Sequence, residues 1–235
     1  MCSSPCFYDM DLSEEVIMGL KEKIMYKLMG TTEELENIYK EKGFCSEWVD
    51  AFKVSHPKMK FMDKFRLADV LNSLERYDEA EALLKEIKIF QITDDLKMAM
   101  YYNTLMCTYI GQKRAEDALE LFRKHQRFFD TFFSAPLYEK YAIAYYDNAA
   151  AVLAMNGEIK GAAQYLELEK KSAQQYDKTG IYPMITYVRM LNLSGDQELA
   201  KEEAEQVRRH IEEWTQYRYS WEKDNFMKVL DNALK

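Results

Sequence analysis

Four segments of the chain repeat one spacing of mostly apolar residues, and this repetition limits the possible fold more than any other feature. In each segment two such residues lie four positions apart, a gap of nine follows, and a second pair four apart comes after the gap. Residues four apart share one face of a helix, so each segment predicts two helices joined by a turn. The four sets are Leu67, Leu71, Ala80 and Leu84; Leu105, Tyr109, Ala118 and Phe122; Ala149, Leu153, Ala162 and Leu166; and Tyr187, Leu191, Ala200 and Ala204.

The nine-residue gaps contain residues typical of turns, which predicts that each helix pair is an antiparallel hairpin. The turn residues are Glu75-Arg76, Gly111 to Lys113, Asn156-Gly157 and Ser194-Gly195. We expect the second helix of each hairpin to begin just before the alanine at position 80, 118, 162 or 200. A small side chain there lets two helix axes cross closely. One hairpin cannot bury its apolar face alone, so the hairpins are expected to stack.

This pattern resembles the tetratricopeptide repeat over roughly residues 60 to 215. It departs from the family at the first-helix anchor, where tryptophan is replaced by Lys64, Tyr102, Tyr146 and Met184. The alanines lie 38, 44 and 38 residues apart, so the repeats are long and are similar to those of Gram-positive peptide-pheromone receptors. The resemblance implies an all-α fold, an α-α superhelix (solenoid) of antiparallel helical hairpins with about four tetratricopeptide-like repeats.

The remaining segments flank the repeats, and we expect four regions in all. Residues 1–12 are expected to be a flexible tail, and 13–58 to hold helices near 13–29, 32–42 and 46–54. Residues 59–217 form the repeats, and 218–235 a capping helix, because Trp221, Phe226 and Leu230 make an apolar stripe at helical spacing.

Composition narrows the compartment and the kind of partner. Only four prolines and eight glycines in 235 residues favour long helices, and a formal net charge of −8 disfavours nucleic acid. No apolar run approaches the ~20 residues of a membrane span, and the acidic first thirty residues lack the pattern of a secretion signal. We therefore expect a cytoplasmic protein without membrane insertion. One alternative stays open, because Cys2-Ser3-Ser4-Pro5 resembles the start of a mature lipoprotein.

Motifs that carry catalysis are missing from the sequence. It contains no phosphate-binding loop, no dinucleotide-binding glycines, no His-Glu-x-x-His and no nucleophile elbow. The three histidines, His56, His125 and His210, are far apart, and the cysteines lack zinc-ligand spacing. We expect no enzyme activity, no cofactor and no metal.

The family resemblance points to the residues that would hold a partner, because first helices line the concave face in tetratricopeptide proteins. Asparagine can donate to and accept from a peptide backbone, and arginine can hold a carboxylate with two parallel bonds. We expect binding positions that face neither the hairpin mate nor the next repeat, namely Arg66, Asp69, Asn72, Asn103, Asp147, Asn148, Tyr182, Arg189 and Asn192.

These observations favour a non-catalytic protein- or peptide-binding scaffold that uses its concave face. A self-associating structural module is an alternative, and a homodimer is compatible with either reading. A regulatory subunit of a larger signalling or enzyme complex is the third hypothesis. The sequence does not identify the partner.

Overall fold

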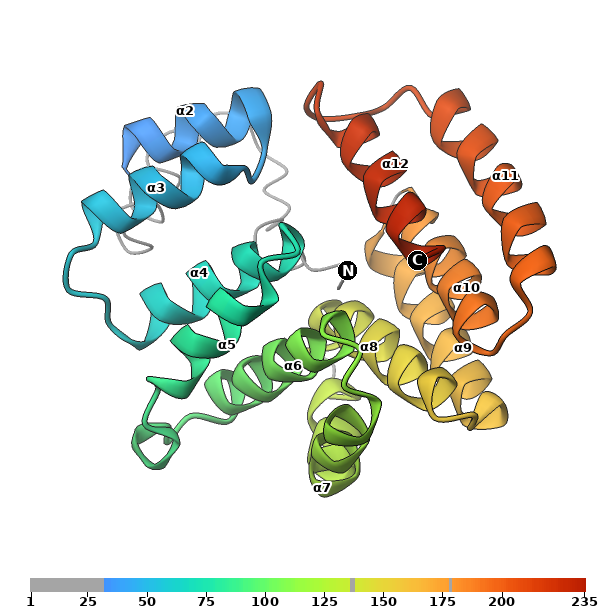
Figure 1. Ribbon diagram of the computed structural model, residues 1–235, viewed down its shortest axis with the longest axis horizontal. Helices are drawn as coiled ribbons and strands as arrows, with labels where there is room; N and C mark the ends of the chain where they lie inside the picture. Colours follow the sequence, from blue (N-terminus) through green and yellow to red (C-terminus); the bar gives the residue numbers. More distant parts are fainter. Residues whose placement is uncertain (1–31, 136–137, 178) are drawn as a thin grey trace.

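The computed structural model describes residues 32–135, 138–177 and 179–235, and this part of the chain is all-helical. It contains eleven α-helices, two short 3-10 helices and no strand (Figure 1). The α-helices are α2 (Glu33–Lys42), α3 (Ser46–Ser55), α4 (Phe61–Ser73), α5 (Tyr77–Lys85), α6 (Asp95–Gly111), α7 (Ala115–Phe133), α8 (Ala142–Met155), α9 (Ile159–Tyr176), α10 (Ile181–Leu193), α11 (Gln197–Glu213) and α12 (Glu222–Ala233). The 3-10 helices are η1 (Ile89–Gln91) and η2 (Glu139–Tyr141).

The helices outside the four hairpins follow the sequence prediction. The expected helices near 32–42 and 46–54 are α2 and α3, and the expected C-terminal helix is α12. The tail at 1–12 and the helix near 13–29 lie outside the described residues.

Four helix pairs pack as the repeated spacing predicts: α4 with α5, α6 with α7, α8 with α9, and α10 with α11. The second helices begin at Tyr77, Ala115, Ile159 and Gln197, in each case three residues before the alanine. All four alanines are fully buried, which confirms that the small residue lies where two helices meet.

The four hairpin turns share one backbone conformation. Glu75, Lys113, Gly157 and Gly195 have φ values of 62°, 58°, 75° and 90°, in the left-handed region. The next residue in each turn donates its N–H to a carbonyl five positions back, at 2.8 to 3.0 Å, and the pairs are Arg76 to Leu71, Arg114 to Tyr109, Glu158 to Leu153 and Asp196 to Leu191. This is the Schellman end of an α-helix, which reverses the chain within a few residues.

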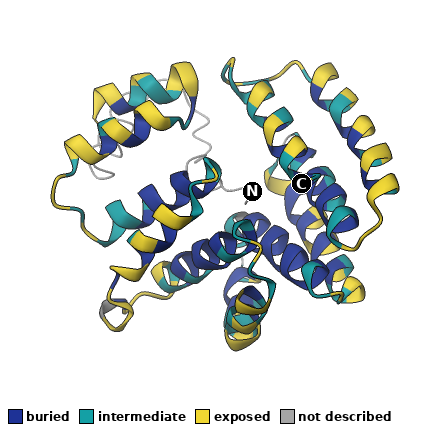
Figure 2. Cartoon of the chain, in the orientation of Figure 1, coloured by how far each residue is buried: buried dark blue, intermediate teal, exposed yellow. Residues whose placement is uncertain are grey.

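Neighbouring hairpins meet through both helices of the earlier hairpin, because α5 also packs on α6, α7 on α8, and α9 on α10. Helix α4 packs on α6, α6 on α8, and α8 on α10, so each first helix contacts the next. Helix α8 lies at the centre and is buried along nearly its whole length (Figure 2). The second helices keep a solvent-exposed face, as α7 and α11 show in the same view.

The C-terminal segment returns to the N-terminal half of the molecule. Helix α12 packs on α10 and α11, and the helices follow a curve that brings it back toward α2 (Figure 1). The ring of Trp221 lies 5.2 Å from that of Tyr39 on α2. Asn232 donates to Glu75 in the α4–α5 turn at 3.2 Å. The two ends of the described chain are therefore joined by direct contacts.

Candidate functional site

The polar residues expected to bind a partner instead connect consecutive first helices. Asn72 on α4 donates to Thr108 Oγ1 on α6 at 3.0 Å and to the Thr104 carbonyl at 3.2 Å. Asn148 on α8 donates to Asn103 Oδ1 on α6 at 3.0 Å. These amides are buried and tie one hairpin to the next.

The same arrangement continues at the C-terminal end of the helix series. Arg189 on α10 donates to Asp147 on α8 at 2.6 Å. Asn192 donates to the Ala233 carbonyl of α12 at 3.2 Å, and the Tyr182 ring lies 5.2 Å from that of Phe226.

The expectation that these positions face neither the hairpin mate nor the next repeat is therefore wrong for most of them. Direct packing of first helix on first helix turns these positions toward the neighbouring hairpin. Six of the nine are buried: Asp69, Asn72, Asn103, Asp147, Asn148 and Arg189. Arg66, Tyr182 and Asn192 are partly exposed. Partner binding by the nine residues stays a prediction.

A buried acid lies beside the Asp147–Arg189 pair. Complete burial, together with the neighbouring Asp147, raises the pKa of Glu169 well above its usual range. The Thr186 hydroxyl lies 2.8 Å from Asp147 Oδ1 and 3.0 Å from Glu169 Oε1. The Thr186 hydroxyl thus lies between the two carboxyl groups and can donate to either. One ion pair and one buried carboxyl of raised pKa thus join α8, α9 and α10.

This cluster leaves three polar atoms without a hydrogen-bond partner in the described part of the chain. They are Arg189 Nε, Arg189 Nη2 and Glu169 Oε2, all buried. Removing one member of a buried ion pair is strongly destabilising. A loss of binding after substitution of Arg189 or Asp147 could therefore result from unfolding and would not identify a binding residue.

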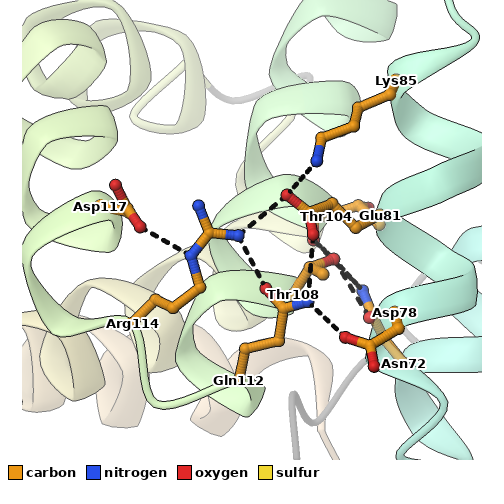
Figure 3. A network of polar contacts seen from close by, with 9 residues as sticks. All are labelled: Asn72, Asp78, Glu81, Lys85, Thr104, Thr108, Gln112, Arg114 and Asp117. Carbon is orange, nitrogen blue, oxygen red and sulfur yellow. Dashed lines mark hydrogen bonds and ion pairs between the residues drawn. The ribbon is translucent and has the colours of Figure 1, made fainter.

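A second polar network joins α5 to the α6–α7 turn (Figure 3). Arg114 and Lys85 each donate to Glu81 at 2.8 Å, and Gln112 donates to it at 3.1 Å. Burial by itself raises the pKa of a carboxyl, but these three hydrogen bonds outweigh it and lower the pKa of Glu81 to about 2. Every charge in this network has a partner, so it supports the fold and offers no open site.

An open cavity lies between two interhelical connections, the one from α3 to α4 and the one from α5 to α6. It measures about 960 Å³ and is formed by the α3–α4 connection, the start of α4, the α5–α6 connection and the start of α6. We call it the linker cavity, and its lining residues are 55–64, 66, 86–88, 92, 93 and 97. Arg66 is the one member of the predicted binding set that lines it.

The linker cavity has a basic lining on an acidic protein. Six basic side chains line it, against two acidic ones, whereas the whole chain carries a formal charge of −8. Both acids are engaged, because Glu86 accepts from Lys64 at 2.6 Å and Asp63 accepts from the Lys60 backbone N–H at 2.9 Å. The other basic residues are Lys58, Lys60, Arg66, Lys88 and Lys97.

Apolar side chains lie both inside and around the linker cavity. Ile87 and Ile92 are buried in its wall, and Met59, Phe61 and Met62 also line it. Phe90 and Val54, each 81% exposed, lie in or next to the connections that form it. Apolar surface exposed in water, rimmed by polar residues, is typical of an interaction site.

Sequence reasoning found only Arg66 of this site, although a signal was present. The segment from His56 to Arg66 contains four basic residues and one acid, an unusual balance in this chain. The second wall comes from residues 86–93, some thirty positions later, and the repeat spacing does not place such connections. The cavity therefore became visible only in the fold.

The described residues hold no group of three or more His, Cys, Asp or Glu side chains placed to bind a metal ion. Within the ranges that the structure describes, no helix has both the length and the apolar content needed to span a membrane. No protein-family model, no curated protein and no solved structure matches the chain.

Proposed function

We propose that the chain is a non-catalytic scaffold that binds a protein or peptide in the linker cavity. The scaffold is an α-α superhelix (solenoid) of four tetratricopeptide-like repeats with α12 as its cap. All four hairpins have a residue in the left-handed conformation at the same turn position and a buried alanine at the same helix position, which supports this interpretation of the fold. The binding surface differs from the concave face expected from the family, because most of those polar residues are bonded between helices.

The observation that carries the proposal is the linker cavity itself. It is open and large enough for several side chains, and it combines an apolar wall with unpaired charge. Binding sites commonly have concave, mostly apolar walls with a few polar groups that fix orientation. The polar networks around Asp147 and Glu81, by contrast, lie between helices and offer no open cavity.

The test uses a substitution that fills the linker cavity without touching the core. Thr93 is exposed, lies outside the helices and lines the cavity, so Thr93→Trp places a large ring inside it. Thr131→Trp on the exposed side of α7 is the matched control. Partners are captured from a native lysate with the unchanged chain and identified by mass spectrometry. The affinity of the strongest partner is then measured by calorimetry.

We expect Thr93→Trp to weaken that affinity by at least about tenfold, because one blocked hot spot removes about 1.4 kcal/mol or more. Thr131→Trp should leave it unchanged, and both variants should keep the melting temperature of the parent. If the partner bound the parent and Thr93→Trp with equal affinity, the binding site would lie on another surface. A chain that captures only itself would favour the self-associating module.

A further inference from the structure

We propose that the partner of the linker cavity is an acidic peptide segment that also carries apolar side chains. This inference rests on the proposed function and adds the chemical class of the partner. It is derived from the basic side chains of the lining that form no ion pair among the described residues and from the apolar side chains in and near the cavity.

The first step is the unpaired positive charge. Lys58, Lys60, Arg66, Lys88 and Lys97 form no ion pair within the described ranges, although acids outnumber bases in the chain by 40 to 32. Such a concentration of one sign attracts the opposite sign and speeds its encounter with the site. The acidic surface elsewhere repels an acidic partner, so the cavity is where such a partner would bind.

The second step is the arrangement of the cations. Lys58 and Lys60 lie on one connection and Lys88 on the other, all three exposed, while Arg66 on α4 is only partly exposed. A guanidinium can hold a carboxylate through two parallel hydrogen bonds, whereas lysines act as mobile point charges. Arg66 therefore orients one carboxylate, and the lysines attract the acidic residues that flank it.

The third step is the apolar surface, which selects among acidic partners. Ile89 and Phe90 follow the lining residue Lys88 in the chain, Val54 precedes the lining residue Ser55, and all three side chains are exposed. A nucleic acid or an inorganic polyphosphate would leave the apolar wall and Phe90 uncovered. A peptide that mixes glutamates with leucine or phenylalanine covers both kinds of surface.

The shape argues against a membrane surface as the partner. The site is a cavity of about 960 Å³ whose apolar wall residues Ile87 and Ile92 are buried, which a flat bilayer surface does not reach. An extended or helical peptide can place a side chain inside a cavity of this size.

The experiment uses a synthetic peptide of alternating glutamate and leucine, with one central phenylalanine and a fluorescein label. Two matched peptides replace every glutamate by glutamine, or every leucine and phenylalanine by alanine. Binding to the full chain is measured by fluorescence anisotropy at low and physiological salt. We expect the parent peptide to bind at least about tenfold more tightly than either control, and more weakly as salt rises.

Variants then locate the peptide in the linker cavity. The double variant Arg66→Gln with Lys88→Gln should weaken binding of the acidic peptide by at least about tenfold, because it removes the carboxylate holder and one attracting charge. Lys201→Gln, an exposed cation on α11, is the control and should have no effect. Phe90→Ala should weaken binding severalfold and leave the salt dependence unchanged, since it removes apolar contact only.

The outcomes separate this inference from the proposed function. If the glutamine peptide binds as tightly as the glutamate peptide and Thr93→Trp blocks both, the cavity binds peptides but the acidic class is wrong. If the double variant binds the acidic peptide unchanged, the peptide lies elsewhere and the inference is overturned. Phe90-dependent binding to vesicles of phosphatidylserine and phosphatidylcholine, without peptide binding, would overturn it in favour of a lipid surface. If Thr93→Trp leaves the affinity of the native partner unchanged, the proposed function itself fails.

Discussion

At the scale of single residues, one left-handed position recurs at the end of every first helix, but glycine occupies only two of the four. Glu75 and Lys113 adopt φ values of 62° and 58°, where a side chain clashes with the following carbonyl. Glu75 gains contacts with the C-terminal segment in return, since Asn232 and Lys235 reach it. Local strain is thus accepted where the residue also joins distant parts of the chain.

Lys113→Gly should stabilise the protein by about 0.5–1 kcal/mol, because glycine adopts the left-handed conformation without steric cost. The reverse change, Gly157→Ala, should destabilise it by a similar amount. An added Cβ at Gly157 meets no atom within 4 Å, so that variant isolates the backbone effect. Urea denaturation measures both changes. An unchanged midpoint in both would mean that the turns tolerate any residue.

Glu81 makes stability depend on pH in the acidic range. Its pKa is lowered to about 2, below the value of about 4.3 in an unfolded chain, so the folded state binds the proton more weakly. Its contribution, about 1–3 kcal/mol, is present above pH 4.3 and is lost as the pH falls toward 2.

We expect Glu81→Gln to destabilise the protein at pH 7, and the difference from the parent to shrink between about pH 5 and pH 2. Thermal unfolding across this range measures the effect. Glu116→Gln, at an exposed position on α7, is the matched control and should show little difference at any pH. If the difference in melting temperature between the parent and Glu81→Gln stayed constant down to pH 2, a lowered pKa at this carboxyl would be excluded.

At the scale of helices, the hairpins depend on close crossings at the buried alanines. Ala118 and Ala162 are fully buried at the start of α7 and α9, next to the first helix of the same hairpin. A larger side chain at either position has to push the two helix axes apart.

Ala118→Leu and Ala162→Leu should each destabilise the protein by about 1–3 kcal/mol. Ala82→Leu on α5 is the control, because this alanine is exposed and leucine is nearly as good a helix former. Chemical denaturation of the three variants measures the comparison. The close-crossing interpretation would be wrong if all three unfolded at the same denaturant concentration.

At the scale of the whole molecule, the C-terminal segment covers the last hairpin and also contacts the N-terminal helix α2. Phe226, Val229 and Leu230 are buried against α10 and α11. The Trp221 ring lies so close to Gly43 that an added Cβ there would approach it to 2.8 Å. Residues 218–235 therefore stabilise both the last hairpin and the N-terminal helix α2.

Deletion of residues 218–235 should lower the melting temperature and cause dimerisation or aggregation, because it uncovers the apolar face of α10 and α11. Light scattering and thermal unfolding measure the result. A milder variant, Trp221→Ala, keeps α12 but removes the ring contacts with Tyr39 of α2 and with Tyr219, so it should lower stability without aggregation. A truncated chain that remained monomeric and equally stable would show that the segment is no cap.

The sequence by itself determined the helices, the turns and the small residues at the crossings. Each of these depends on residues four to nine positions apart, such as Leu71 and Ala80, and helical geometry alone relates them. The positions of Asn72, Asn148 and Arg189 on first helices were likewise predictable from this spacing.

Only the tertiary structure decided which of these polar residues face solvent. Asn72 bonds a residue 36 positions away, and Glu75 meets one 157 positions away. Such contacts depend on how successive hairpins pack on one another, which the repeat spacing does not fix. This packing brings each first helix against the next and buries most of the expected binding residues, while the two basic connections form the linker cavity.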